Sequence, residues 1–399
     1  MTYRTRCILL LVAAVLGVAV AVLGAVTLLF PHVLPHSRTP GLAECLIGSK
    51  PAAGLDLAAG LAATAVAVLG LRRRAMSSAG STTLRVAAVA VVLLVAACTP
   101  GGVIPASGYT FVLVVAAGIV TLLVLFVLRH RVAGTVATIV GAGAFVLLWL
   151  MSPVSEWVPQ VLASLVAETP LLLLSLAHLA TAGALAAWVL GDPTARGGLA
   201  RGVLRHRTAL TVAAALCALP YAIARASWLT PWKLLGGELA SEAPLVLLTG
   251  LFLGAAMVAA GVLTLVLRLP WSERFPRWMA GIGGRAVPVG LVVIPASFVA
   301  VLFTAGGWEM VFWRIGSAPM DITTVELVLV LPFWLWGPLL ALATWGYAMH
   351  RADRAVRDAE RPNATRLSGT IGDPGLSAAV KARVERELEL IEEREPRRR

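Results

Sequence analysis

The sequence has few charged residues. Asp, Glu, Lys and Arg make up 14% of its 399 positions, whereas 59% are hydrophobic. A single soluble core cannot hide that much apolar surface from water, so a water-soluble globular protein is excluded. The mean hydropathy of +0.86 indicates that a lipid bilayer is the main solvent of the chain.

Two further patterns are missing from the sequence. Alternating apolar and polar residues, which membrane-spanning strands require, are absent, so the apolar runs are predicted to be helices. The motifs CxxC, HExxH and GxSxG and a phosphate-binding glycine loop are absent as well. No cofactor, metal site or enzymatic activity is therefore expected, and a membrane-embedded enzyme ranks below the other functions.

Ten apolar runs are long enough to cross roughly 30 Å of hydrocarbon as helices. They cover Cys7 to Phe30, Ala52 to Leu71, Leu84 to Thr99, Tyr109 to Leu128, Val132 to Met151, Leu162 to Leu190, Thr208 to Ala224, Ala243 to Leu267, Ala286 to Ala305 and Val325 to Met349. The third and seventh runs are the shortest, which leaves a count between nine and eleven open. The predicted fold is an all-α, polytopic transmembrane helix bundle in residues 1–350.

The basic residues indicate the orientation. With the N-terminus inside, 16 of them fall in inner segments, five in outer segments and 12 in the tail after Met349. Cytoplasmic loops carry an excess of Lys and Arg, so both termini are predicted to be cytoplasmic, with the protein in the cell membrane. The net charge of +12 is thus explained by topology and by attraction to an anionic inner leaflet. Nucleic acid is not expected as a partner.

Small residues and prolines recur inside the spans. Three glycine pairs place small residues on one side of a helix: Gly17 with Gly24, Gly134 with Gly141, and Gly250 with Gly254. They predict close helix contacts within the bundle. Proline interrupts the later spans, as at Pro332. The backbone carbonyls freed at such breaks can bind ions in carriers, or neighbouring helices can satisfy them.

The ionisable residues inside the spans are the candidates for a site. His178 lies near the middle of the sixth span, close to Ser175 and Thr181. At that depth it is a candidate proton relay or solute contact; the alternative is a neutral histidine hydrogen-bonded across a helix pair.

Four more candidates lie near the outer face: Asp56, Glu168, Arg225 and Glu326. They are predicted to line an outward-facing polar vestibule or, alternatively, to be solvated helix ends.

The four cysteines suggest one covalent link. Cys45 is placed in the first outer loop and Cys98 at the outer end of the third span, so both can face an oxidising compartment and form a disulfide.

The tail, residues 351–399, is the one sizeable aqueous segment. Its apolar residues from Leu376 to Ile391 recur three or four apart, which predicts an amphipathic helix. This helix is expected to associate with itself or to dock a cytoplasmic protein; lying on the inner membrane surface is the alternative.

Two loops carry a resemblance. The segment LPYAIARASW, which begins at Leu219, and the segment RLPWSERFPRWMAGIGGRAVPV, which begins at Arg268, resemble parts of uncharacterised polytopic integral membrane proteins of actinobacteria. This resemblance implies the membrane class and carries no activity.

Two functions remain open at this point. One is a carrier of a small solute, since ten spans divide into two five-span halves of opposite orientation. The other is a non-transporting scaffold or sensor whose tail docks a cytoplasmic partner.

Overall fold

A computed structural model gives the fold of the chain. It describes residues 3–31, 40–72, 78–101, 154–191, 197–235, 237–238, 244–275, 284–317 and 322–371, with positions 124, 127, 132, 134–136, 138–143 and 386. The described residues are almost all helical, and one isolated antiparallel bridge joins Arg274 to Ala286.

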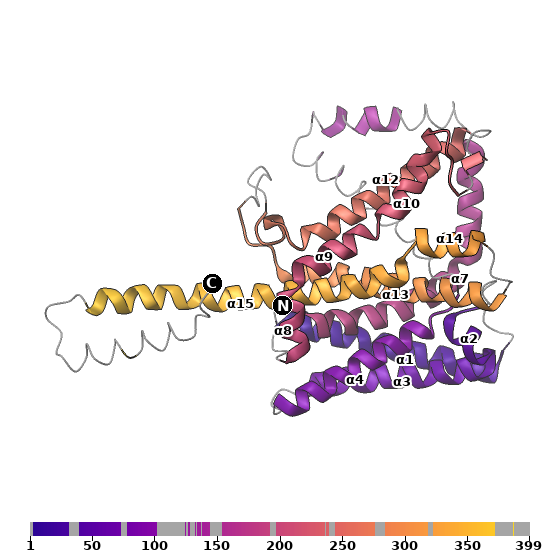
Figure 1. Cartoon of the computed structure of the whole chain (residues 1–399). Helices are drawn as coiled ribbons and strands as arrows, with labels where there is room; N and C mark the ends of the chain where they lie inside the picture. Colours follow the sequence, from indigo (N-terminus) through magenta and orange to yellow (C-terminus); the bar gives the residue numbers. More distant parts are fainter. Residues whose placement is uncertain are drawn as a thin grey trace.

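Figure 1 shows the helices in chain order. They are α1 (Tyr3–Leu29), α2 (Leu42–Ile47), α3 (Ser49–Arg72), α4 (Ser78–Ala97), α7 (Val154–Leu190), α8 (Gly198–Arg205), α9 (Arg207–Leu216), α10 (Leu219–Ala226), the 3₁₀ turn η1 (Ser227–Leu229), α12 (Pro244–Val266), the 3₁₀ turn η2 (Pro270–Ser272), α13 (Val289–Ser317), α14 (Ile322–Val330) and α15 (Phe333–Ile371).

Seven of the described helical segments are long and apolar enough to cross a membrane. They are Tyr3–Leu29, Ser49–Arg72, Thr169–Leu190, Arg207–Leu229, Val246–Val266, Val289–Phe312 and Glu326–Arg357. They coincide with seven of the ten predicted spans, so the all-helical membrane class is confirmed.

The structure describes the other three predicted spans to different extents. The third corresponds to the shorter apolar helix Thr82–Ala97 within α4, and the fifth overlaps Gly134–Gly143. The fourth lies outside the described residues except for positions 124 and 127. The count of ten therefore stays a prediction.

Glycines let α1 and α3 approach closely. A Cβ at Gly60 would lie 2.3 Å from the backbone nitrogen of Ala21, and one at Gly24 would lie 2.5 Å from that of Leu57. Gly17 faces Thr64 in the same way. The predicted contact face of Gly17 and Gly24 is thus confirmed as the α1–α3 interface, because only a residue without a side chain fits these positions.

Two apolar cores meet at α13. One core joins α1, α3, α4 and α7 and includes Val301 of α13. The other joins α9, α13 and α15 around the fully buried Trp336, beside which Phe303 and Phe333 stack at 4.6 Å between ring centroids. Because α13 contributes to both cores, it holds the two halves of the bundle together.

The two ends of the bundle differ in chemistry. Figure 1 shows α2 at one end, and α8 with the projecting second half of α15 at the other. Arginines gather at the α8 end: Arg72, Arg201, Arg207, Arg268 and Arg354. The α2 end is lined by Glu44 and Asp56.

The tail boundary predicted at residue 350 falls inside α15, which continues as one helix to Ile371. Apart from Arg386, the predicted amphipathic helix lies outside the described residues.

The α1–α3 interface gives a stability prediction. Gly60→Ala is expected to lower the free energy of unfolding by about 1 to 3 kcal/mol, because the new methyl group overlaps the α1 backbone. Thermal unfolding in detergent, followed by circular dichroism, measures the change. Gly54→Ala on the same helix is the control, since a Cβ there meets nothing within 4 Å. An equal effect of the two variants would contradict the close approach.

Candidate functional site: a buried histidine and aspartate pair

His178 is enclosed within the bundle. It lies on α7 with no solvent-exposed surface, and its helical neighbours Ser175 and Thr181 are equally buried. The polar cluster predicted around His178 is therefore inside the protein, away from lipid. At such a position both ring nitrogens need a hydrogen-bond partner.

Both nitrogens of His178 have one. Nδ1 lies 2.9 Å from the carbonyl oxygen of Leu174, one turn earlier on α7. Nε2 lies 2.7 Å from Oδ1 of Asp56 on α3. The structure thus brings together two of the five predicted site residues.

The carbonyl partner fixes one proton. A carbonyl oxygen only accepts, so Nδ1 of His178 carries a hydrogen and donates it to Leu174. The contact between Nε2 and Asp56 then needs one more proton. It lies either on the imidazole, giving an ion pair, or on the carboxyl, giving a neutral pair. In both forms one proton lies between the two side chains, which makes the pair a single hydrogen-bonded unit.

Asp56 connects this unit to a pocket. Its side chain is 16% exposed, whereas that of His178 is fully enclosed. Asp56 lines a pocket of about 80 Å³ at the α2 end, together with Glu44, Cys98, Thr99 and Leu174. That volume holds several water molecules, so Asp56 is the point where water reaches the pair.

Ser175 adds an unused hydroxyl at the same depth. Its Oγ is buried and has no hydrogen-bond partner among the described residues. A buried hydroxyl without a partner costs about 1 to 3 kcal/mol. A polar ligand such as water, hydrogen-bonded to the hydroxyl of Ser175, would therefore be favoured here.

The other predicted residues do not join the pair. Glu326 on α14 is exposed, and the side chain of Glu168 on α7 lies outside the described residues. Among the described residues, no ion pair links Arg225 to Asp56 or Glu326. Of these four residues, Asp56 is the one that lines the pocket among the described residues, and the common vestibule stays a prediction.

Arg225 belongs to a different cluster. Its guanidinium carbon lies 4.2 Å from the ring centroid of Trp228 and 4.7 Å from that of Tyr221. Trp228 in turn covers Gly250, and Gly254 faces Arg225, so the predicted contact face on α12 is confirmed. Cation–π contacts hold this arginine against the aromatic rings, which gives it a structural role.

The two outer cysteines are unbridged. All four cysteines of the chain are free thiols, with Cys45 exposed and Cys98 half-buried in the pocket wall. Burial, Glu309 and Glu44 raise the pKa of the Cys45 thiol, so the reactive thiolate is disfavoured there. The disulfide proposed from the sequence is not formed in this structure.

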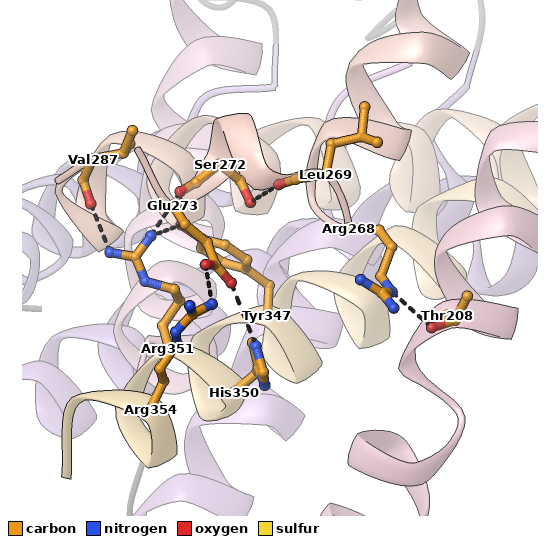
Figure 2. A network of polar contacts seen from close by, with 10 residues as sticks. All are labelled: Thr208, Arg268, Leu269, Ser272, Glu273, Val287, Tyr347, His350, Arg351 and Arg354. Atoms are coloured by element: carbon orange, nitrogen blue, oxygen red, sulfur yellow. Dashed lines mark hydrogen bonds and ion pairs between the residues drawn. The ribbon is translucent and has the colours of Figure 1, made fainter. Parts of the chain in front are cut away.

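A second polar network, at the α8 end, was missed from the sequence (Figure 2). Arg351 of α15 donates hydrogen bonds to the carbonyl oxygens of Ser272, at 2.7 Å, and Val287, at 3.0 Å. The hydroxyl of Tyr347 also donates to Ser272, at 2.7 Å. These bonds fasten the connection between α12 and α13 to α15. Their acceptors are backbone carbonyls, for which side-chain patterns give no signal.

The described residues include no group of three His, Cys, Asp or Glu side chains placed to hold a metal ion. Comparisons with protein-family models, with curated proteins and with solved structures find no match. The Asp56–His178 pair and its pocket are therefore the features on which the proposed function rests.

The proton arrangement predicts unequal effects of two substitutions at Asp56. Asp56→Asn keeps a donor, because its amide can bond to the unprotonated Nε2 of His178, so its unfolding midpoint should stay near wild type. Asp56→Ala leaves Nε2 buried without a partner and should lose about 2 to 4 kcal/mol of stability.

Thermal unfolding in detergent compares the two variants. Glu326→Ala, which removes an exposed carboxylate, is the control for the loss of a negative charge. If Asp56→Asn and Asp56→Ala unfold at the same temperature, the hydrogen bond to His178 contributes no stability.

Proposed function

We propose that the chain is a multi-pass membrane carrier of a small solute, and that the Asp56–His178 pair binds the proton that drives it. The observation that supports this is the 2.7 Å contact between an enclosed imidazole and a carboxylate that opens into a pocket. A paired acid and base inside a membrane bundle is the arrangement that proton relays use.

The pair couples protonation to contact between helices. Asp56 lies on α3 and His178 on α7, so the proton they share joins these two helices. Removing that proton leaves a carboxylate facing an imidazole nitrogen lone pair, which repel each other. The α3–α7 contact then weakens. In the proposed cycle this change links proton release to movement of the helices around the pocket.

The pocket chemistry bears on the solute. Its wall carries two carboxylates, Glu44 and Asp56, and no Lys or Arg side chain among the described residues. Apart from Pro100 and Leu174, the other lining residues are Gly or Ala, or carry a hydroxyl or thiol group. A small cationic or neutral polar solute fits this lining better than an anion, because an anion would face both carboxylates.

The proposed orientation places the pocket outside. The α8 end carries the arginines, and the positive-inside rule assigns that end to the cytoplasm. Asp56 then faces the extracellular side, and both termini are cytoplasmic in the cell membrane. Protons would reach the Asp56–His178 pair from outside, and the solute would enter the pocket from the same side.

A scaffold or sensor is the second candidate function, and α15 is the observation that favours it. This helix has 39 residues, about 58 Å at the usual rise per residue, and therefore extends well past the bundle. Arg354 forms an ion pair with Glu273 at its base, where the helix leaves the bundle. Such a fixed projection suits docking of a cytoplasmic protein or of a second copy.

Transport in proteoliposomes tests the carrier. With a pH-sensitive dye inside, adding solutes from a panel of small amines, amino acids and sugars should change the internal pH for wild type. Asp56→Asn should give less than a tenth of the wild-type rate, because its amide cannot release the shared proton.

A chain truncated after Ile371 is the control, since a carrier does not need its tail. Asp56→Asn moving protons with solute at the wild-type rate would contradict the role of the pair. No solute response from the full chain, together with binding of a cytoplasmic protein that the truncated chain loses, would favour the docking function.

Thiol labelling tests the orientation. With the native cysteines replaced, Asp56→Cys should react with a membrane-impermeant maleimide in intact cells, whereas Arg72→Cys should react only in inverted vesicles. The two positions lie near opposite ends of α3. Labelling of Arg72→Cys in intact cells, with Asp56→Cys protected, would reverse the orientation.

A further inference from the structure

Arg207 is a half-buried cation at the junction of three helices. It is the first residue of α9, and its Cβ lies beside Gly346 of α15. Arg268, just beyond α12, and Arg354 of α15 are within electrostatic reach of it. Its backbone carbonyl accepts a hydrogen bond from Thr211, but no hydrogen bond or ion pair to its guanidinium is found among the described residues.

The charges around Arg207 are not balanced. Among the described residues, Glu273 is the one acidic neighbour in electrostatic reach of Arg207, and its carboxylate already pairs with Arg354 and with His350, the latter at 3.5 Å. In the same part of the chain, the side chain of Arg268 bonds to a neutral group, the hydroxyl of Thr208, at 2.9 Å (Figure 2).

Three arginines facing one carboxylate repel one another, most strongly where they are partly shielded from water. An anion placed between Arg207 and Arg268 would offset that repulsion. Guanidinium groups bind phosphate oxygens through two parallel N–H donors, so a phosphate suits these arginines.

The position of the two arginines points to lipid as the source of the phosphate. Arg207 begins one candidate membrane span, and Arg268 follows the end of another. Headgroup phosphates lie at this level of a bilayer. On the membrane side of the arginines, α9 exposes Val212, and α12 exposes Val262 and Leu263. These side chains can contact the acyl chains of a lipid whose phosphate lies at Arg207 and Arg268.

We propose that Arg207 and Arg268 form a binding site for the phosphate of an anionic phospholipid, at the level where α9 and α12 leave the bilayer. The site is separate from the Asp56–His178 pair, which lies toward the other end of the bundle. It adds a specific lipid partner to the general attraction between arginines and an anionic leaflet.

Lipid titration of the purified full chain in detergent tests the site. Phosphatidylglycerol should raise the unfolding temperature of wild type, whereas phosphatidylcholine at the same concentration should not. Arg207→Gln should weaken the apparent affinity for phosphatidylglycerol about tenfold, because it removes a charged donor pair. Arg207→Lys keeps the charge but lacks the planar guanidinium. Its apparent affinity for phosphatidylglycerol should therefore lie between those of wild type and Arg207→Gln.

Arg201→Gln is the matched control, since Arg201 is an exposed arginine at the same end of the bundle. Arg201→Gln should change the apparent affinity for phosphatidylglycerol less than twofold. Equal weakening by Arg201→Gln and Arg207→Gln would show diffuse attraction and overturn the site. Stabilisation by inorganic phosphate equal to that by the lipid, at the same concentration, would overturn the lipid as its ligand.

Discussion

A polar group in hydrocarbon has no water to bond with, and the arrangement of this bundle depends on that constraint. Buried threonines satisfy it locally. The hydroxyls of Thr181, Thr211 and Thr344 each donate to the carbonyl oxygen four residues earlier on their own helix. His178 cannot do so with both nitrogens, because its ring reaches beyond its own helix. Its second nitrogen needs another helix, and Asp56 of α3 provides the partner.

The same constraint separates the two ends of the bundle. At the α2 end, carboxylates and hydroxyls face a pocket large enough for water. At the α8 end, Arg351 bonds to two loop carbonyls and fastens the connection between α12 and α13 to α15. Close contacts at Gly24 and Gly60 join α1 to α3, and the polar group in this interface, the hydroxyl of Thr64, bonds to backbone carbonyls.

The helical class could be predicted from the sequence, because helical periodicity is a local property. Residue size also predicted the contact faces of Gly17 with Gly24 and of Gly250 with Gly254, whereas a Cβ at Gly141 meets nothing within 4 Å among the described residues. His178 could be selected as an ionisable residue deep in a span, and Asp56 as one near the end of a span. Their pairing could not be predicted, since 122 residues separate them and nothing local fixes the contact between α3 and α7. The local surroundings of Arg225 could not be predicted either, since its contact with Trp228 depends on how the chain turns between α10 and η1.

The burial of His178 has an electrical consequence. The pair lies inside the bundle, and the pocket at Asp56 is its connection to water. A proton that reaches the pair from the pocket has therefore crossed part of the membrane field, whose full drop is worth about 2.3 kcal/mol per 100 mV for one charge. In the orientation proposed above, with the pocket outside, a membrane potential that is negative inside would draw that proton from the pocket toward the pair.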